Sequence, residues 1–140
     1  MDIGNLKIIS HQWKASAWYR QAARFGLVGI LNTVLDWAIY LLLAQAFGAG
    51  PVLAKILSYS AGVLNSFYLN RSWTFHSRAN FTKAFPPFLG ISLAGILINS
   101  GCMYLAVYWL NLDDLFALIL ATAAAFGWNF AASRRFVFRD

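Results

Sequence analysis

A single carboxylate lies in the middle of the first long apolar stretch of the chain. Asp36 is eleven residues from either end of the stretch 25–47. A carboxylate at mid-bilayer depth costs about 2.5–3.5 kcal/mol, so such groups usually face a cavity or a partner. At helical spacing Asp36 shares a face with other small or polar residues, namely Gly29, Asn32, Thr33 and Tyr40. This face is interpreted either as a substrate-contacting or proton-exchanging surface, or as a contact that only fixes helix packing.

Two further stretches carry polar side chains on one side. In 88–110 the face equivalent to that of Asp36 holds Ser92, Gly95, Asn99 and Met103. In 52–70 one side holds Lys55, Ser58, Tyr59, Gly62, Asn65, Ser66 and Asn70. Packing this side against the Asp36 face would satisfy both sets of polar groups. Lys55 is expected to lie closer to the outer surface of the membrane than Asp36. It could neutralise Asp36, meet an anionic headgroup, or extend to the outer interface.

Arginine and aromatic residues alternate in two short segments. These read Asn70-Arg71-Ser72-Trp73-Thr74-Phe75 and Ser133-Arg134-Arg135-Phe136-Val137-Phe138. Guanidinium groups bind phosphate through paired hydrogen bonds, and aromatic rings settle at headgroup depth. The segments are predicted either to capture a lipid phosphate or simply to anchor the chain at the interface.

The composition indicates an integral membrane protein. The 140 residues are 60% hydrophobic and 11% charged, whereas soluble domains carry about 25% charged residues. A single cysteine, Cys102, excludes an internal disulfide framework and a Cys-based zinc site. No nucleophile with a base, metal-ligand spacing or phosphate-binding loop is present, so neither an enzyme nor a cofactor is expected. The net charge of +6 is assigned to membrane orientation rather than to nucleic acid.

Four stretches are long enough to span a membrane, which needs about 20 apolar residues. They are 25–47, 52–70, 88–110 and 115–133, and short turns at 48–51 and 111–114 pair them as two hairpins. Residues 72–87 are expected to form the one long loop. Lys and Arg precede the first stretch and occur in the long loop and at the C-terminus, but the short turns contain none. By the positive-inside rule, this distribution predicts that both termini and the long loop are cytoplasmic.

The segment before the first span, residues 1–24, is expected to contain an amphipathic helix. Leu6, Ile9, Trp13 and Ala17 recur at helical spacing over 3–23, with basic residues elsewhere on the wheel. This helix would lie on the cytoplasmic leaflet; the alternative is a basic tail that only sets topology.

The two hairpins align at a constant offset of 63 residues. Phe25 falls on Phe88, Asp36 on Asn99, and Arg71 on Arg134, without a gap. The predicted fold is therefore an all-α membrane protein of four transmembrane helices. They form two parallel-repeat hairpins, 25–75 and 88–138, related by an axis along the membrane normal.

Taken in order, these motifs resemble the GtrA-like family of small four-span proteins from bacterial envelope polysaccharide pathways. The resemblance is carried by Arg24-Phe25-x-x-x-Gly29-x-x-Asn32-Thr33-x-x-Asp36, Ala54-Lys55-x-x-Ser58-Tyr59, Asn65-x-Phe67-x-x-Asn70-Arg71-x-Trp73-x-Phe75 and Asn129-Phe130-x-x-x-Arg134-Arg135-Phe136-x-Phe138. It covers about residues 24–138.

The resemblance implies that the chain flips a polyprenyl-phosphate-linked monosaccharide, such as undecaprenyl-phosphate glucose, from the cytoplasmic to the outer leaflet of the bacterial inner membrane. Partner glycosyltransferases would use the sugar, and a homodimer or larger assembly is expected. Arg71, Arg134 and Arg135 would take the phosphate, and Lys55 would meet it near the outer face. The expected sugar and further substrate contacts are Asp36, Asn32, Tyr59, Asn65, Asn70, Asn99 and Asn129.

Two other functions stay open. A membrane scaffold that recruits a glycosyltransferase would keep the basic aromatic ends without needing Asp36. A proton-coupled exporter of small cations would need Asp36 to titrate and would bind cationic amphiphiles.

Overall fold

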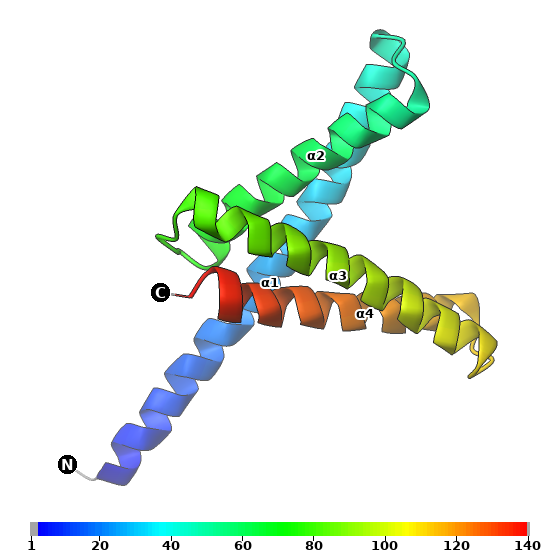
Figure 1. Cartoon of the computed structure of the whole chain (residues 1–140). Coiled ribbons are helices and arrows are strands. Elements are labelled where there is room, and N and C mark those ends of the chain that lie inside the picture. Colours follow the sequence, from blue (N-terminus) through cyan, green and yellow to red (C-terminus); the bar gives the residue numbers. More distant parts are fainter. Residues whose placement is uncertain (1–2, 140) are drawn as a thin grey trace. The chain divides into compact units, whose positions relative to one another are not determined.

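The described part of the chain is helical, with no strand. A computed structural model describes the backbone of residues 3–139 and, apart from residues 3–16, 51, 52, 55 and 114, their side chains. The α-helices and π-helical turns (η), in chain order (Figure 1), are α1 (Ile3–Leu41), η1 (Leu42–Ala46), α2 (Pro51–Leu69), η2 (Asn70–Thr74), α3 (Phe81–Tyr108), α4 (Asp114–Ala132) and η3 (Ser133–Val137). The all-α prediction is confirmed.

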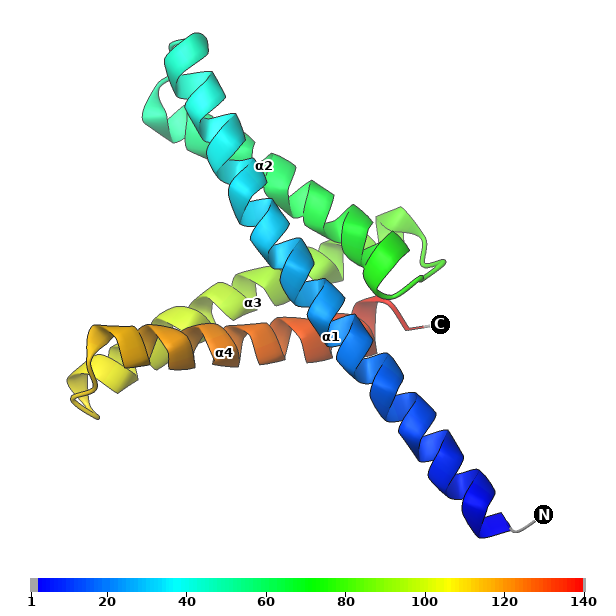
Figure 2. The same cartoon turned by 180° about the vertical axis from the view of Figure 1, so that it is seen from behind.

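The chain divides into two compact units, Met1–His76 and Ser77–Asp140. In the first unit α1 packs along α2 and η2, and in the second α3 packs along α4 and η3. Each pair is antiparallel, and the N-terminal part of α1 continues past the end of α2 (Figures 1 and 2). Each polar contact described below lies inside one of these helix pairs.

Short connections join the helices within each unit. Between η1 and α2, Gly48 has φ +64°, a conformation that glycine adopts without strain. Pro51 then occupies the first turn of α2, where its missing N–H removes no helical hydrogen bond. Between α3 and α4, Asn111 has φ +51°, which asparagine tolerates better than most residues.

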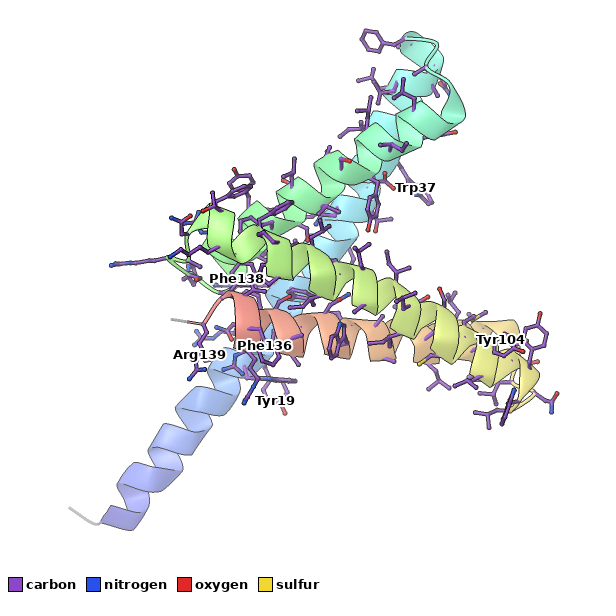
Figure 3. The ribbon with its side chains drawn as sticks, viewed as in Figure 1. Tyr19, Trp37, Tyr104, Phe136, Phe138 and Arg139 are labelled. Atoms are coloured by element: carbon purple, nitrogen blue, oxygen red, sulfur yellow. The ribbon has the colours of Figure 1, made fainter. Side chains whose placement is uncertain are left out.

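Three helical stretches are long and apolar enough to cross a membrane. They are Ala17–Ala46, Phe81–Tyr108 and Leu115–Val137. Their outer faces carry large apolar side chains, including Trp37 (Figure 3), which is 67% exposed, and Leu97, which is 74% exposed. Soluble monomers rarely expose so much contiguous apolar surface, whereas lipid tails solvate it well. The chain is therefore a membrane protein, and a fourth span along α2 stays a prediction.

The boundaries of α2 and η2 correspond to those of α4 and η3 at the 63-residue offset. α2 and α4 each contain 19 residues, and each continues into a five-residue π-helical turn. Each unit closes with a tilted aromatic pair: the Phe25 and Phe75 ring centroids are 6.0 Å apart, and those of Phe88 and Phe138 are 5.9 Å apart. Ala54 and its counterpart Ala117 are both completely buried.

The long loop expected at 72–87 is much shorter in the structure. η2 extends helical backbone to Thr74, and α3 begins at Phe81. The Asn80 side chain caps α3 by accepting a hydrogen bond from the Thr82 backbone N–H at 3.0 Å. Pro86 and Pro87 lie inside α3. Membrane helices tolerate proline where neighbouring groups or water satisfy the freed carbonyls, so the two prolines do not delay the start of the helix.

The N-terminal segment is helical, as expected from its pattern, but no break separates it from the first span. α1 runs continuously from Ile3 to Leu41. The side chains of residues 3–16, on which the amphipathic pattern depends, lie outside the described residues. An interfacial position for this segment therefore stays a prediction.

Candidate functional site

Asp36 lies on the contact between α1 and α2. The Ser58 hydroxyl, which is completely buried, donates a hydrogen bond to Oδ1 of Asp36 at 2.6 Å. Asp36 itself is half-buried. A hydrogen bond to a charged acceptor is shorter and stronger than one between neutral groups, and it offsets part of the penalty of placing a carboxylate in an apolar helix pair. The first helix face therefore does pack against the polar side of the second.

A second polar pair joins the same two helices. Nδ2 of Asn65 donates a hydrogen bond to Oδ1 of Asn32 at 2.7 Å. Nδ2 of Asn32 is buried and has no hydrogen-bond partner among the described residues. Such an unpaired donor carries a penalty of about 1–3 kcal/mol unless water or a ligand accepts from it. Asn32 therefore has its amide NH₂ group left to donate to a bound polar group.

Gly62 lies beside these pairs on α2. A Cβ added there would be 3.9 Å from the Asn32 carbonyl oxygen and 4.0 Å from Cβ of Asp36. Both are ordinary van der Waals distances. The helices consequently approach closely here without requiring glycine.

The other predicted residues of α2 lie in different settings. Tyr59 is 39% exposed and makes no hydrogen bond within the described residues. Asn70 is buried and belongs to a ladder along its own helix: Nδ2 donates to Ser66 Oγ at 3.3 Å, and Oδ1 accepts from Thr74 at 2.9 Å. The side chain of Lys55 lies outside the described residues. The structure thus groups Asp36, Asn32 and Asn65, with Tyr59 away from them.

The basic end of the first unit is organised around Arg24. Its guanidinium Nη1 donates to the Trp73 carbonyl at 3.0 Å and lies 2.9 Å from Nε2 of His76. The guanidinium also lies over the Trp73 ring, 5.4 Å from the centroid. These contacts hold η2 against α1. They were not predicted from the sequence.

The three arginines predicted to hold phosphate differ in exposure. Arg71, on η2, is half-buried, and its Nε is buried without a partner among the described residues. Arg134 and Arg135, on η3, are exposed, and Arg135 lies 5.8 Å from the centroid of the Phe136 ring. Figure 3 shows Phe136 and Arg139 at this C-terminal end. π-Helical turns occur frequently at functional sites, and both arginine segments lie on one.

The second unit keeps the amides but loses the carboxylate. Asn129 packs against Gly95, where an added Cβ would lie 2.8 Å from Cγ of Asn129. Oδ1 of Asn129 and the hydroxyl of Ser133 are buried without partners in the part of the chain that the structure describes. Asn99 is half-buried, and its amide makes no hydrogen bond there either. The second unit therefore also has polar groups left to offer a bound molecule.

Comparison with known proteins identifies the family. The model of the GtrA/DPMS transmembrane domain matches residues 24–138, which include both helix pairs and both π-helical turns after them. The chain belongs to this family. The match begins at Arg24, which ties η2 to α1, and ends at Phe138, which packs on Phe88. The family resemblance drawn from the motifs is thereby confirmed.

Relatives in the GtrA/DPMS family cover most of the chain. An uncharacterized membrane protein of Bacillus subtilis, YngA, is 36% identical over 121 residues, covering 84% of this chain and 78% of the relative. A bactoprenol-linked glucose translocase of Salmonella phage P22 is 26% identical, covering 84% of this chain and 94% of the relative. A bactoprenol-linked glucose translocase of Shigella phage SfV is 27% identical, covering 84% of this chain and 93% of the relative.

Proposed function

We propose that this protein moves a polyprenyl-phosphate-linked monosaccharide, such as undecaprenyl-phosphate glucose, from the cytoplasmic to the outer leaflet. The observation that carries the proposal is the family match over 24–138, together with two relatives described as bactoprenol-linked glucose translocases. The polar pairs inside the apolar α1–α2 contact support it, because a sugar crossing a membrane needs replacements for its water. Moving an intact lipid needs no bond to break, so the proposed role is transport without catalysis.

The proposed topology places four spans in the inner membrane with both termini in the cytoplasm. α2 and η2 together contain 24 residues from Pro51 to Thr74, long enough for a tilted span. The short connections at 47–50 and 109–113 carry no Lys or Arg, so the positive-inside rule puts them outside. The matching element boundaries support two parallel repeats about an axis along the membrane normal, with the N-terminal part of α1 on the cytoplasmic surface.

The substrate phosphate would be taken up at the cytoplasmic ends of the second and fourth spans. Arg71 has a free Nε, and the exposed Arg134 and Arg135 have guanidinium groups open to the interface. A guanidinium matches two phosphate oxygens at once. Lys55 would meet the phosphate again near the outer face. The sugar hydroxyls would exchange hydrogen bonds with Asp36, Asn32 and Asn65, then with the remaining amides at Asn99 and Asn129.

A single protomer of 140 residues offers few helices to enclose a sugar, so we expect a homodimer or a larger assembly. The consumer of the translocated lipid would be a glycosyltransferase facing outward. Removal of the product by that enzyme would draw the lipid across without another energy source.

A scaffold that anchors a glycosyltransferase is the second candidate, favoured by one observation. Asp36 bonds Ser58 and Asn32 bonds Asn65 across the helix contact, as residues that only fix packing would. Transport requires that these pairs open to the substrate, whereas scaffolding requires that they stay closed.

Proteoliposomes carrying labelled polyprenyl-phosphate glucose in one leaflet separate the two functions. A membrane-impermeant reagent reports the sugar on the other side for the wild type, for Asp36→Asn and for Thr33→Val. Thr33 is the matched control because it is exposed on the same helix and its hydroxyl bonds its own backbone at Gly29, at 3.1 Å. Transport predicts that only Asp36→Asn slows the appearance of sugar. No acceleration by the wild type over protein-free liposomes, with retained binding to a transferase, would favour the scaffold.

A further inference from the structure

A hollow of about 740 Å³ lies on the second unit. It is lined only by α3 and the first turns of α4. Its polar lining consists of Asn99, Ser100, Tyr104 and Tyr108, and Met103 and Leu118 belong to the apolar remainder. Concave sites of about 300–1,000 Å³ that combine an apolar wall with a few polar groups are the usual form of small-molecule sites.

The amide of Asn99 has no partner across its helix pair. Its counterpart Asp36 bonds Ser58, but the residue that corresponds to Ser58 is Ala121, which is buried and apolar. The Asn99 side chain makes no hydrogen bond to another described residue. An amide that faces an apolar medium without a hydrogen bond is unfavourable. A polar group from outside the helix pair would remove that penalty.

The polar side chains of the hollow form a column along α3. Residues 99 and 108 are separated by a rise of roughly 13 Å at 1.5 Å per residue. The Tyr104 and Tyr108 rings lie 4.9 Å apart by their centroids, and both side chains are more than half exposed. Figure 3 shows Tyr104 near the end of α3 that leads to α4. In the proposed topology this column runs from the middle of the span to the outer surface.

The geometry points to a binding site in this hollow for the hydroxylated head of a glycolipid. Asn99 offers both a donor and an acceptor to sugar hydroxyls, and the tyrosines add hydroxyls and flat apolar faces. The lipid tail lies along the apolar wall and the neighbouring bilayer. The site rests on the proposed function, since it gives the outward half of the passage a defined receptor for the sugar.

Photocrosslinking of the full-length protein in nanodiscs tests this site. Two probes carry a diazirine on the first carbon of the same dodecyl chain, one with a β-glucosyl head and one with a phosphocholine head. The variants are Asn99→Leu and, as matched control, Ser92→Ala. Ser92 is a polar residue of α3 outside the hollow whose hydroxyl bonds its own backbone at Phe88, at 3.0 Å.

The glucoside is expected to crosslink to peptides between residues 99 and 118, and the phosphocholine probe is not. Asn99→Leu should weaken glucoside binding roughly 2- to 10-fold, the effect of one neutral hydrogen bond, and Ser92→Ala should leave it unchanged. Tyr104→Phe keeps the ring and removes the hydroxyl, and it serves as a second variant should Asn99→Leu fold poorly. It should also weaken glucoside binding.

Equal crosslinking by both probes, or crosslinking unaffected by Asn99→Leu and Tyr104→Phe, would overturn the site. If a second copy of the chain covers the hollow and no crosslinks form, the proposed site is overturned too. Normal translocation without glucoside-specific crosslinks removes the site and leaves the proposed function. Specific crosslinks without translocation keep a glycolipid site and remove the transport function.

Discussion

Two glycines, Gly62 on α2 of the first unit and Gly95 on α3 of the second, respond differently to the same substitution. A methyl group at Gly95 would lie 2.8 Å from Cγ of Asn129, well inside van der Waals contact. A methyl group at Gly62 would find its nearest neighbours 3.9 and 4.0 Å away. Gly95→Ala therefore forces the Asn129 amide to move, whereas Gly62→Ala fits the existing space.

The expected magnitudes follow from these contacts. Overpacking of a closely packed site costs about 1–3 kcal/mol, and the Asn129 amide has little room because its Oδ1 is already buried. Replacing a helical glycine by alanine without a clash gains about 0.5–1 kcal/mol. Both variants share this gain, so they should differ in unfolding free energy by about 1–3 kcal/mol, the overpacking cost at Gly95.

Reversible unfolding in mixed detergent micelles measures this difference. In the background of Asn129→Ala the obstructing amide is absent, so Gly95→Ala should lose most of its penalty. The pair should show a coupling free energy of about 1–3 kcal/mol, within the range for residues in contact. Equal effects of Gly95→Ala and Gly62→Ala, or an unchanged penalty in the Asn129→Ala background, would refute the packing described for the second unit.

Three further predictions concern the polar contacts of the first unit and the arginine ends. Ser58→Ala removes the hydroxyl that bonds Asp36 and should lower the unfolding free energy by about 1–3 kcal/mol; an unchanged detergent unfolding curve would contradict the pairing. Arg24→Met removes the bond to the Trp73 carbonyl, so hydrogen exchange of amides 73–76 should accelerate at least several-fold, and unaltered exchange would show that Arg24 does not hold η2. Arg134→Gln changes an exposed side chain and should leave stability within about 0.5 kcal/mol, while weakening binding of a polyprenyl phosphate about tenfold or more, as expected for a charge-assisted bond. Unchanged affinity in a fluorescence titration would contradict a phosphate role.

The elements were largely predictable from the sequence because apolar length and helix-breaking residues are local signals. Residues 48–51 contain two glycines and a proline, and the structure bends there. The pairing of the Asp36 face with the polar side of α2 followed from the need to satisfy polar groups in an apolar surrounding. The predicted length of the central loop was wrong. The loop was expected to reach Pro87, but Asn80 caps a helix that already begins at Phe81 and contains both Pro86 and Pro87.

Other contacts depend on residues whose proximity no local pattern encodes. Arg24 meets Trp73 and His76 across about fifty residues of chain, and its sequence context indicated only a positive charge near a membrane. The fit of Asn129 into the space left by Gly95 depends on the depth to which two helices approach. Helical spacing gives the face of a helix but not that depth, so this contact could be found only in three dimensions.

Transbilayer movement of the proposed lipid is the most direct test of the account. Wild-type protein in liposomes should speed the appearance of polyprenyl-phosphate glucose in the opposite leaflet relative to protein-free liposomes. A phospholipid of the same labelled leaflet serves as the internal reference and should cross at the protein-free rate. Acceleration confined to the glucosyl lipid is the predicted result. No acceleration by folded protein, or equal acceleration of both lipids, would contradict selective translocation.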